Sequence, residues 1–147
     1  MERTNFRYVT PTDLQGEMPS FASIDVSFIS LSLILPVLKT LLVPGGDCIA
    51  LIKPQFEAGK NQVGKKGIVR DPAVHKMVIE KIMTLAIKEG YHIAGLSYSP
   101  ITGGDGNIEF LIHLKWSGDA ESGESFLSTT PDEVIEEAHN QLKANTQ

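Results

Sequence analysis

The stretch Ser99-Pro-Ile-Thr-Gly-Gly-Asp-Gly106 separates two apolar segments, Tyr91 to Ser97 and Asn107 to Trp116. Proline, aspartate and several glycines in so short a run are typical of a turn. Two strands joined by such a connection pair antiparallel if they are neighbours, because a parallel pair needs a crossover of a dozen or more residues. We therefore expect the last strand of the sheet to run against the strand that precedes it.

Upstream of this turn, strand and helix patterns alternate as in an α/β fold with parallel strands. The expected elements are strands at 22–28, 47–53 and 91–97, helices at 31–42 and from Pro72 up to Gly90, a long loop at 54–70, and a final strand at 107–116. The continuous apolar run at 48–52 is typical of a strand buried on both faces. The pattern predicts three parallel strands, with 107–116 inserted antiparallel between 47–53 and 91–97.

Length and composition fit one modest core, since the chain has 147 residues of which 41% are hydrophobic. We expect one domain at 1–116, followed at 117–147 by an irregular linker and a C-terminal helix that begins at the capping box Thr130-Pro-Asp-Glu133. Cys48 is the only cysteine, which excludes an internal disulfide and favours a reducing compartment. The longest apolar stretch is too short to span a bilayer, so we expect a cytoplasmic protein.

Each of three predicted strands carries an ionisable residue: Asp25 late in the first, Lys53 at the end of the second, and Glu109 near the start of the last. Ligands of open α/β sheets bind at the carboxyl ends of the parallel strands, and a reversed last strand begins at that same edge. The three side chains would then converge. A partly desolvated lysine between carboxylates can accept a proton from a hydroxyl, or stabilise an alkoxide as it forms. An ordinary ion pair at the end of a strand would explain the same residues.

The loop that follows Lys53 is basic although the whole chain carries a formal net charge of −5. Its other cationic side chains are Lys60, Lys65, Lys66 and Arg70. A local basic loop can bind phosphates on an acidic protein, because salt screens repulsion beyond about 10 Å. A solvated loop without a ligand is the alternative interpretation. The four histidines are not grouped with acidic residues or cysteine at metal-ligand spacing, so we expect no metal site.

Four runs of the sequence resemble the TlyA or hemolysin A-like family, which belongs to the FtsJ-like RNA 2′-O-ribose methyltransferases. The runs are Asp25-Val-Ser-Phe-Ile-Ser-Leu31, Leu51-Ile-Lys-Pro-Gln-Phe-Glu-Ala-Gly59, Val63-Gly-Lys-Lys-Gly-Ile-Val-Arg-Asp71, and Ser99-Pro-Ile101 with Gly106-Asn-Ile-Glu-Phe-Leu111. The resemblance covers roughly residues 1–115 and keeps the order of the motifs. It implies the second half of a Rossmann-like methyltransferase sheet, with parallel strands and one antiparallel strand near the C-terminus.

The resemblance also implies roles for individual residues. The family uses S-adenosylmethionine to methylate a ribose hydroxyl of ribosomal RNA, and its catalytic tetrad is Lys-Asp-Lys-Glu. Asp25, Lys53 and Glu109 match the last three members, while the first lysine, the glycine-rich cofactor loop and an S4-type RNA-binding domain are expected upstream of residue 1. We therefore expect this chain, as an isolated piece, to be incomplete and inactive. Expected cofactor contacts are Glu2, Asn5, Asp25 and Val26, and expected RNA contacts are Lys60, Lys65, Lys66 and Arg70.

Two other functions remain open at the level of the sequence. The basic loop at 53–71 also fits a non-catalytic module that binds RNA or assists ribosome assembly. The word hemolysin in the family name suggests a membrane-active protein, which nothing in the composition favours. The interpretation that we favour is a fragment of a ribosomal RNA methyltransferase, with ribosomal RNA or a ribosomal subunit as its partner.

Overall fold

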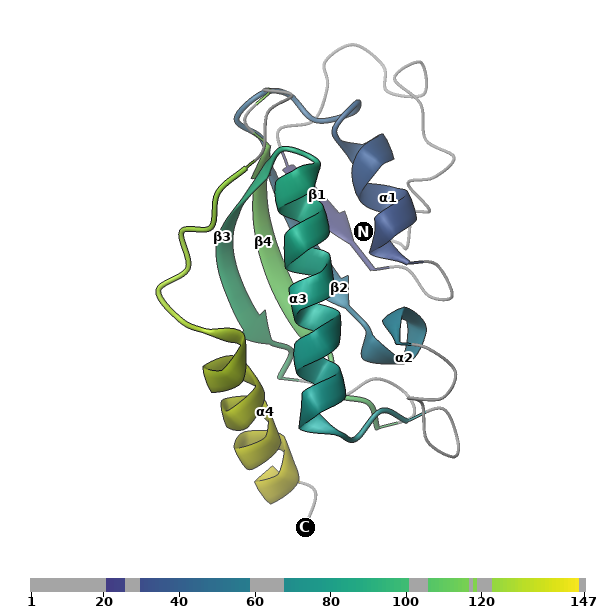
Figure 1. The fold of residues 1–147 in the computed structure, drawn as a ribbon, viewed down its shortest axis with the longest axis vertical. Helices are drawn as coiled ribbons and strands as arrows, with labels where there is room; N and C mark the ends of the chain where they lie inside the picture. The colour runs from purple at the N-terminus through teal and green to yellow at the C-terminus, as the bar shows by residue number, and fades with distance from the viewer. Residues whose placement is uncertain are drawn as a thin grey trace.

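The computed structural model describes residues 21–25, 30–58, 68–100, 106–116, 118 and 123–145. Its elements are β1 (Phe21–Ile24), α1 (Leu31–Leu38), β2 (Asp47–Ile52), α2 (Pro54–Glu57), α3 (Pro72–Lys88), β3 (Tyr91–Tyr98), β4 (Phe110–Trp116) and α4 (Pro131–Asn145). Figure 1 shows α1 and α3 on the same face of the sheet. The C-terminal helix α4 packs against α3 and β3.

The four strands form one sheet in the order β1-β2-β4-β3. β1 pairs parallel with β2, and β4 pairs antiparallel with both β2 and β3, so β1, β2 and β3 share one direction. This arrangement confirms the predicted α/β sheet in which the last strand is inserted antiparallel between its two predecessors. The connection from Ser99 to Gly106 is too short for a crossover, so the chain turns back beside β3.

The core lies between the sheet and the two helices that cover this face. Its fully buried members include Ile34, Leu35, Ile79, Ile82, Ala50, Ile112 and Leu114. Cys48 also belongs to this core, as expected, and burial raises the pKa of its thiol to about 12. A thiol with that pKa is almost fully protonated at neutral pH, so Cys48 is a packing residue and not a nucleophile.

The structure differs from the sequence predictions at the ends of several elements. The first strand, predicted at 22–28, ends at Ile24, so Asp25 lies just beyond it. The first helix ends at Leu38 instead of residue 42. The chain then forms a hydrogen-bonded turn in which Leu41 and Leu42 are still buried. The predicted loop at 54–70 begins with the four-residue helix α2, because Pro54 suits the first position of a helix. The final strand begins at Phe110 instead of residue 107, since the buried Asn107 side chain accepts a hydrogen bond from the Val69 amide at 2.8 Å.

Residues 123–126 run alongside β3 in space. From the sequence, the segment to which they belong is predicted to be an irregular linker. The Ile93 amide donates to the Glu124 carbonyl, and the Phe126 amide donates to the Ile93 carbonyl, both at 2.8 Å. The amide of Gly123 donates to the Ile87 carbonyl at 2.8 Å. These bonds direct the chain along the sheet toward α4. The sequence contains no strand pattern here because one isolated bridge needs no alternation of side chains.

A pair of histidines connects α4 to α3. His75 is buried and its ring binds the Val69 carbonyl through Nε2 and His139 Nε2 through Nδ1, each at 3.0 Å. Because the carbonyl can only accept, the Nε2 of His75 carries a proton and donates it in a hydrogen bond. The unprotonated Nδ1 of His75 then accepts a hydrogen bond from the Nε2–H of His139. Burial lowers the pKa of His75, and the proximity of His139 lowers it further. The pair therefore holds α4 in place when both rings are neutral.

Stability is expected to fall as the pH drops below the ordinary histidine pKa of 6.5. Between that value and the lower pKa of folded His75, the unfolded chain binds one more proton, so acid favours unfolding by up to about 1.4 kcal/mol per pH unit. Thermal unfolding at pH 7.5 and 5.5 measures this loss. The loss should shrink in His75→Gln, and an equal acid sensitivity in both proteins would contradict the assignment to His75.

Candidate functional site

One end of the sheet, where β1 and β2 terminate and β4 begins, carries Asp25, Lys53 and Glu109. We call this end the site edge of the sheet. Asp25 follows the last residue of β1, Lys53 follows the last residue of β2, and Glu109 precedes the first residue of β4. β2 pairs with β4 in a register that places Ile52 opposite Phe110, and one further step places Lys53 opposite Glu109. Because β4 runs antiparallel, its beginning meets the carboxyl ends of β1 and β2, as the sequence predicted.

Lys53 and Asp25 form an ion pair in which the lysine Nζ lies 2.5 Å from Asp25 Oδ1. The Lys53 side chain is only 8% exposed, whereas that of Asp25 is 38% exposed. A buried ammonium is costly unless a counter-ion and hydrogen bonds accompany it. Asp25 supplies the counter-ion, and its partly exposed carboxylate is the part of the ion pair that contacts solvent.

Glu109 is held by a residue that the sequence analysis did not single out. Gln55, in α2, donates its side-chain amide to Glu109 Oε2 at 3.1 Å. Glu109 is itself buried, with 8% of its surface exposed. Within the part of the chain that the structure describes, the side-chain oxygen Oε1 of Gln55 is buried and has no hydrogen-bond partner. Its position two residues after Lys53 was the available signal, but glutamine has no charge that would have drawn attention to it.

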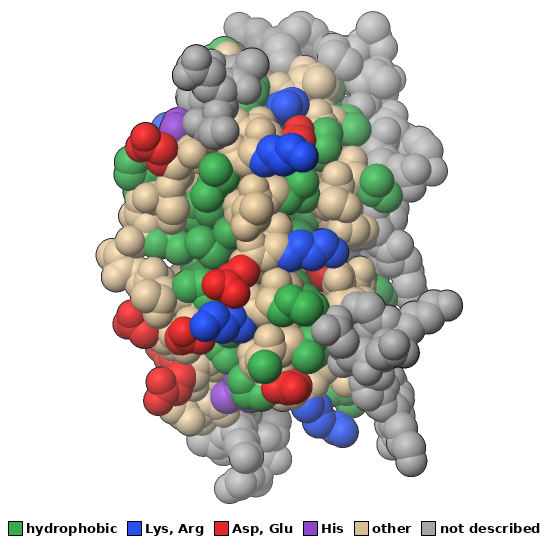
Figure 2. All heavy atoms as spheres, in the orientation of Figure 1, with side chains coloured by type: hydrophobic (Ala, Val, Ile, Leu, Met, Phe, Trp, Pro, Cys, Tyr) green, Lys and Arg blue, Asp and Glu red, His purple; other side chains and the backbone are tan. Residues whose placement is uncertain are grey.

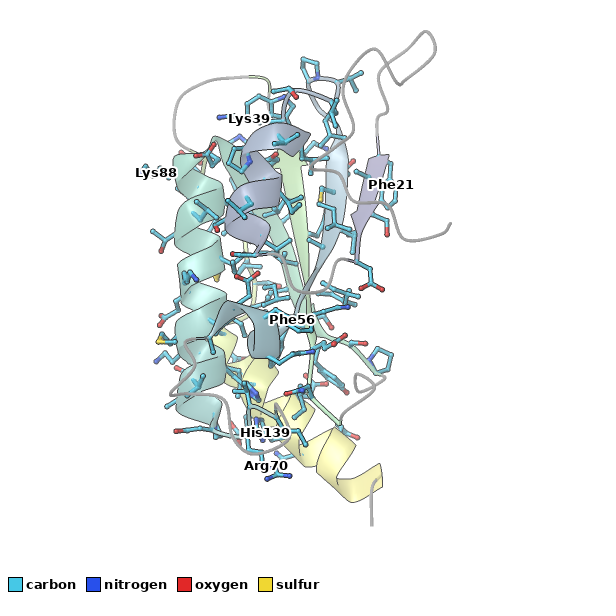
Figure 3. All side chains as sticks on the ribbon, turned by 90° about the vertical axis from the view of Figure 1, so that its right-hand side faces the viewer. Phe21, Lys39, Phe56, Arg70, Lys88 and His139 are labelled. Carbon is cyan, nitrogen blue, oxygen red and sulfur yellow. The ribbon has the colours of Figure 1, made fainter. Side chains whose placement is uncertain are left out.

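The helix α2 sets the direction in which the chain leaves Lys53. The Phe56 amide donates to the Lys53 carbonyl at 2.9 Å, and the Ala58 amide donates to the Pro54 carbonyl at 2.9 Å. Figure 3 shows Phe56 on this short helix, beside the sheet. The last residue of α2, Glu57, is buried and was also missed as a member of the site. Its carboxylate contacts the beginning of α1.

The expected RNA contacts are only partly described by the structure. Lys60, Lys65 and Lys66 lie outside the described residues, as do the expected cofactor contacts Glu2, Asn5 and Val26. Arg70 is exposed, and Figure 3 shows it at the same end of the molecule as His139. The neighbouring Val69 is bonded to the Asn107 side chain, two residues before Glu109. Arg70 is thus connected to the segment that leads into the site.

The face that carries α1 and α3 shows cationic and acidic side chains interspersed (Figure 2). Two of its lysines pair with acidic side chains, since Lys39 lies 3.0 Å from Glu89 and Lys76 lies 3.1 Å from Asp132. No group of three or more metal-ligating residues occurs among the residues that the structure describes. No helix within the described ranges is long and apolar enough to cross a membrane.

Comparison with known proteins places these observations in a family. The model of the FtsJ-like methyltransferases matches residues 1–116. The chain is 63% identical over 143 residues to YqxC of Bacillus subtilis (strain 168), a candidate rRNA methyltransferase, and this match covers 97% of the chain and 51% of the relative. It is 38% identical over 119 residues to the 16S/23S rRNA (cytidine-2′-O)-methyltransferase TlyA of Mycobacterium tuberculosis (strain CDC 1551 / Oshkosh), covering 81% of the chain and 44% of the relative.

A solved structure agrees with this assignment. A candidate hemolysin from Streptococcus thermophilus superimposes with a TM-score of 0.90 at 50% sequence identity, over 97% of this chain and 50% of that chain. The present chain spans about half the length of the curated relatives that it matches. The family match covers both strand ends and the start of β4, where Asp25, Lys53 and Glu109 stand. The chain therefore belongs to the FtsJ-like methyltransferase family.

Proposed function

We propose that this chain forms part of an S-adenosylmethionine-dependent ribosomal RNA methyltransferase that modifies a ribose 2′-hydroxyl. The observation that carries the proposal is the buried Lys53 ammonium, paired with Asp25 at the site edge of the sheet, where Glu109 also lies. Membership of the FtsJ-like family supports the reaction class. The names of YqxC and TlyA support ribosomal RNA as the substrate.

The proposed chemistry concerns the proton of the ribose hydroxyl, which is a poor nucleophile while it keeps that proton. As the ammonium that pairs with Asp25, Lys53 stabilises the oxyanion that forms as the hydroxyl proton leaves for water, and it accepts that proton itself only once the ammonium has lost a proton of its own. Asp25 keeps the lysine nitrogen in place through their ion pair. Glu109, oriented by Gln55, lies on the other side of the lysine and orients the hydroxyl. Together the three residues prepare one oxygen for reaction.

The described part of the site fits a methyl donor of this kind. S-adenosylmethionine supplies the methyl group when it is bound. It is a sulfonium cation with sugar hydroxyls, and the partly exposed carboxylate of Asp25 offers such a ligand both a negative charge and a hydrogen-bond acceptor. We propose Glu2, Asn5 and Val26 as further contacts to the cofactor. Lys60, Lys65, Lys66 and Arg70 are the proposed contacts to RNA phosphates.

The test is methyl transfer by the whole gene product to ribosomal RNA, with radioactive S-adenosylmethionine as donor. A 2′-O-methyl group blocks alkaline cleavage of the adjacent phosphodiester, because the attacking hydroxyl is gone. We therefore expect the label in alkali-resistant dinucleotides. Label recovered only in mononucleotides would indicate base methylation and would refute ribose chemistry. An absence of transfer to ribosomal subunits and to free ribosomal RNA would refute the proposed substrate.

Replacing Gln55 with alanine is expected to lower kcat by roughly 10- to 100-fold, because a hydrogen bond to a charged group contributes about 1.5–3 kcal/mol. The KM for RNA should change little, since Gln55 bonds to Glu109 and not to a phosphate in this arrangement. The exposed Gln141 of α4 provides the matched control, and Gln141→Ala should keep the original rate. Equal rates in both variants would mean that Gln55 does not orient Glu109.

A further inference from the structure

Glu57 is an acidic residue whose side chain is only 3% exposed. A carboxylate in such a position needs hydrogen bonds, because burial removes the water that would otherwise solvate it. Both of its oxygens have partners. The Ser30 hydroxyl donates to Glu57 Oε1 at 2.6 Å, and the Leu31 amide donates to Glu57 Oε2 at 2.8 Å.

The partners of Glu57 belong to the first turn of α1. Amides at the beginning of a helix lack partners within the helix, and the helix dipole favours a negative charge there. Ser30 is itself the N-cap, and it accepts from the Ser32 amide at 3.0 Å while donating to Glu57. Glu57 therefore completes the cap of α1 from a position 26 residues further along the chain.

Two contacts join the segment that carries Asp25 to the segment that carries Lys53. One is the ion pair between these two residues. The other is the hydrogen bond from Ser30, five residues after Asp25 in the sequence, to Glu57 at the end of the short helix that follows Lys53. Since α2 is internally hydrogen-bonded from Lys53 to Ala58, a displacement of Glu57 would be transmitted to the lysine.

Lys81 of α3 also approaches Glu57, but its contribution is small. Its Nζ lies 3.3 Å from the Glu57 carbonyl oxygen and 4.0 Å from Oε1. The Lys81 side chain is half-exposed, and ion pairs of that kind are weakened by water and salt. The two short hydrogen bonds to α1 are therefore the main restraint on the Glu57 carboxylate.

We propose that Glu57 is a positioning residue for Lys53: by bonding α2 to the beginning of α1, it fixes the lysine nitrogen relative to Asp25. The inference rests on the proposed function of Lys53 as the group that acts on the ribose hydroxyl. Buried as it is, Glu57 is not placed to touch RNA. Its role is confined to geometry, so its loss should change kcat and leave substrate binding intact.

The experiment measures kcat, the KM for ribosomal RNA and the KM for S-adenosylmethionine in the whole gene product. In Glu57→Ala we expect kcat to fall by about 100-fold, since a displacement of roughly 1 Å has that effect on a positioned group. Both KM values should stay within about twofold. Glu57→Gln should recover much of the rate, because its carboxamide oxygen can still accept from the Leu31 amide.

Glu133→Ala is the matched control. Glu133 is also a glutamate bonded to a helix-capping hydroxyl, that of Thr130 just before α4, but it is exposed. It should keep the original kcat. If Glu57→Ala does not fold, Ser30→Ala decides the question, because it removes one of the two bonds and should lower kcat by about 10-fold.

An unchanged kcat in folded Glu57 or Ser30 variants would overturn the inference, as would a loss confined to KM. These results are distinct from failure of the proposed function. In that case the unaltered protein itself would not methylate ribosomal RNA, and the assignment of Glu57 would fall with that of Lys53.

Discussion

Replacing Lys53 with alanine is expected to lower kcat for ribose methylation by about 10²–10⁴-fold, the usual effect of losing a positioned acid–base group. The physical reason is that the hydroxyl would keep its proton, or develop negative charge without the buried ammonium that now lies beside Asp25. Affinity for S-adenosylmethionine should change little, because the loss affects the chemical step. Single-turnover methyl transfer by the whole gene product, together with equilibrium binding of the cofactor, measures both quantities.

Lys53→Arg separates proton transfer from electrostatic stabilisation. Arginine keeps the positive charge but does not give up its proton in proteins, and its planar group is larger than an ammonium. We expect no rescue of the rate. Near-normal turnover in Lys53→Arg would mean that Lys53 acts only by its charge. Near-normal turnover in Lys53→Ala would remove this residue from the mechanism altogether.

Replacing Gly123 with alanine is expected to lower the free energy of unfolding more than any other substitution proposed for this protein. A Cβ atom at this position would lie 1.7 Å from the Tyr91 carbonyl oxygen, so the backbone would have to move. Movement would break the three backbone-to-backbone hydrogen bonds that hold 123–126 against α3 and β3. At about 1 kcal/mol each, the free energy of unfolding should fall by roughly 3 kcal/mol. Urea unfolding measures the change.

Gly95→Ala is the matched control, because Gly95 lies in β3 near the same contact. Its added Cβ would lie 3.4 Å from the His113 Cβ, a close but tolerable distance. We expect a change within about 1 kcal/mol. Hydrogen exchange adds a local measurement, since the amides of Ile93 and Phe126 should lose protection only in Gly123→Ala. Similar stability in the two variants would contradict the close approach at Gly123.

The strand order could be predicted from the sequence because it depends on features with strong local signatures. The turn Ser99 to Gly106 is too short for a crossover, and the apolar run at 48–52 indicates a central strand. Once the last strand is reversed, Asp25, Lys53 and Glu109 must meet at one edge. Their convergence is therefore a result of topology, and it required no knowledge of side-chain packing.

Gln55 and Glu57 could not be identified in the same way. Their partners are Glu109, Ser30 and Leu31, and the separation along the chain is 54 residues for the first contact and 26 for the last. Nothing local distinguishes a buried, hydrogen-bonded glutamate from an exposed one at the end of a short helix. Such contacts depend on how α2 docks between other elements, and they become visible only when the tertiary structure is known.

The position of β4 has a consequence for how the chain is assembled during synthesis. Of the four strands that the structure describes, β4 is made last, yet it lies between β2 and β3. Before residues 110–116 leave the ribosome, the edges of β2 and β3 that later face β4 have no strand to pair with, and unpaired edges favour association with other chains. Completion of the sheet must then bring together segments more than 60 residues apart, as for Cys48 and Leu114, and contacts of such long range form slowly. Completion of this sheet thus depends on the strand that begins beside Glu109.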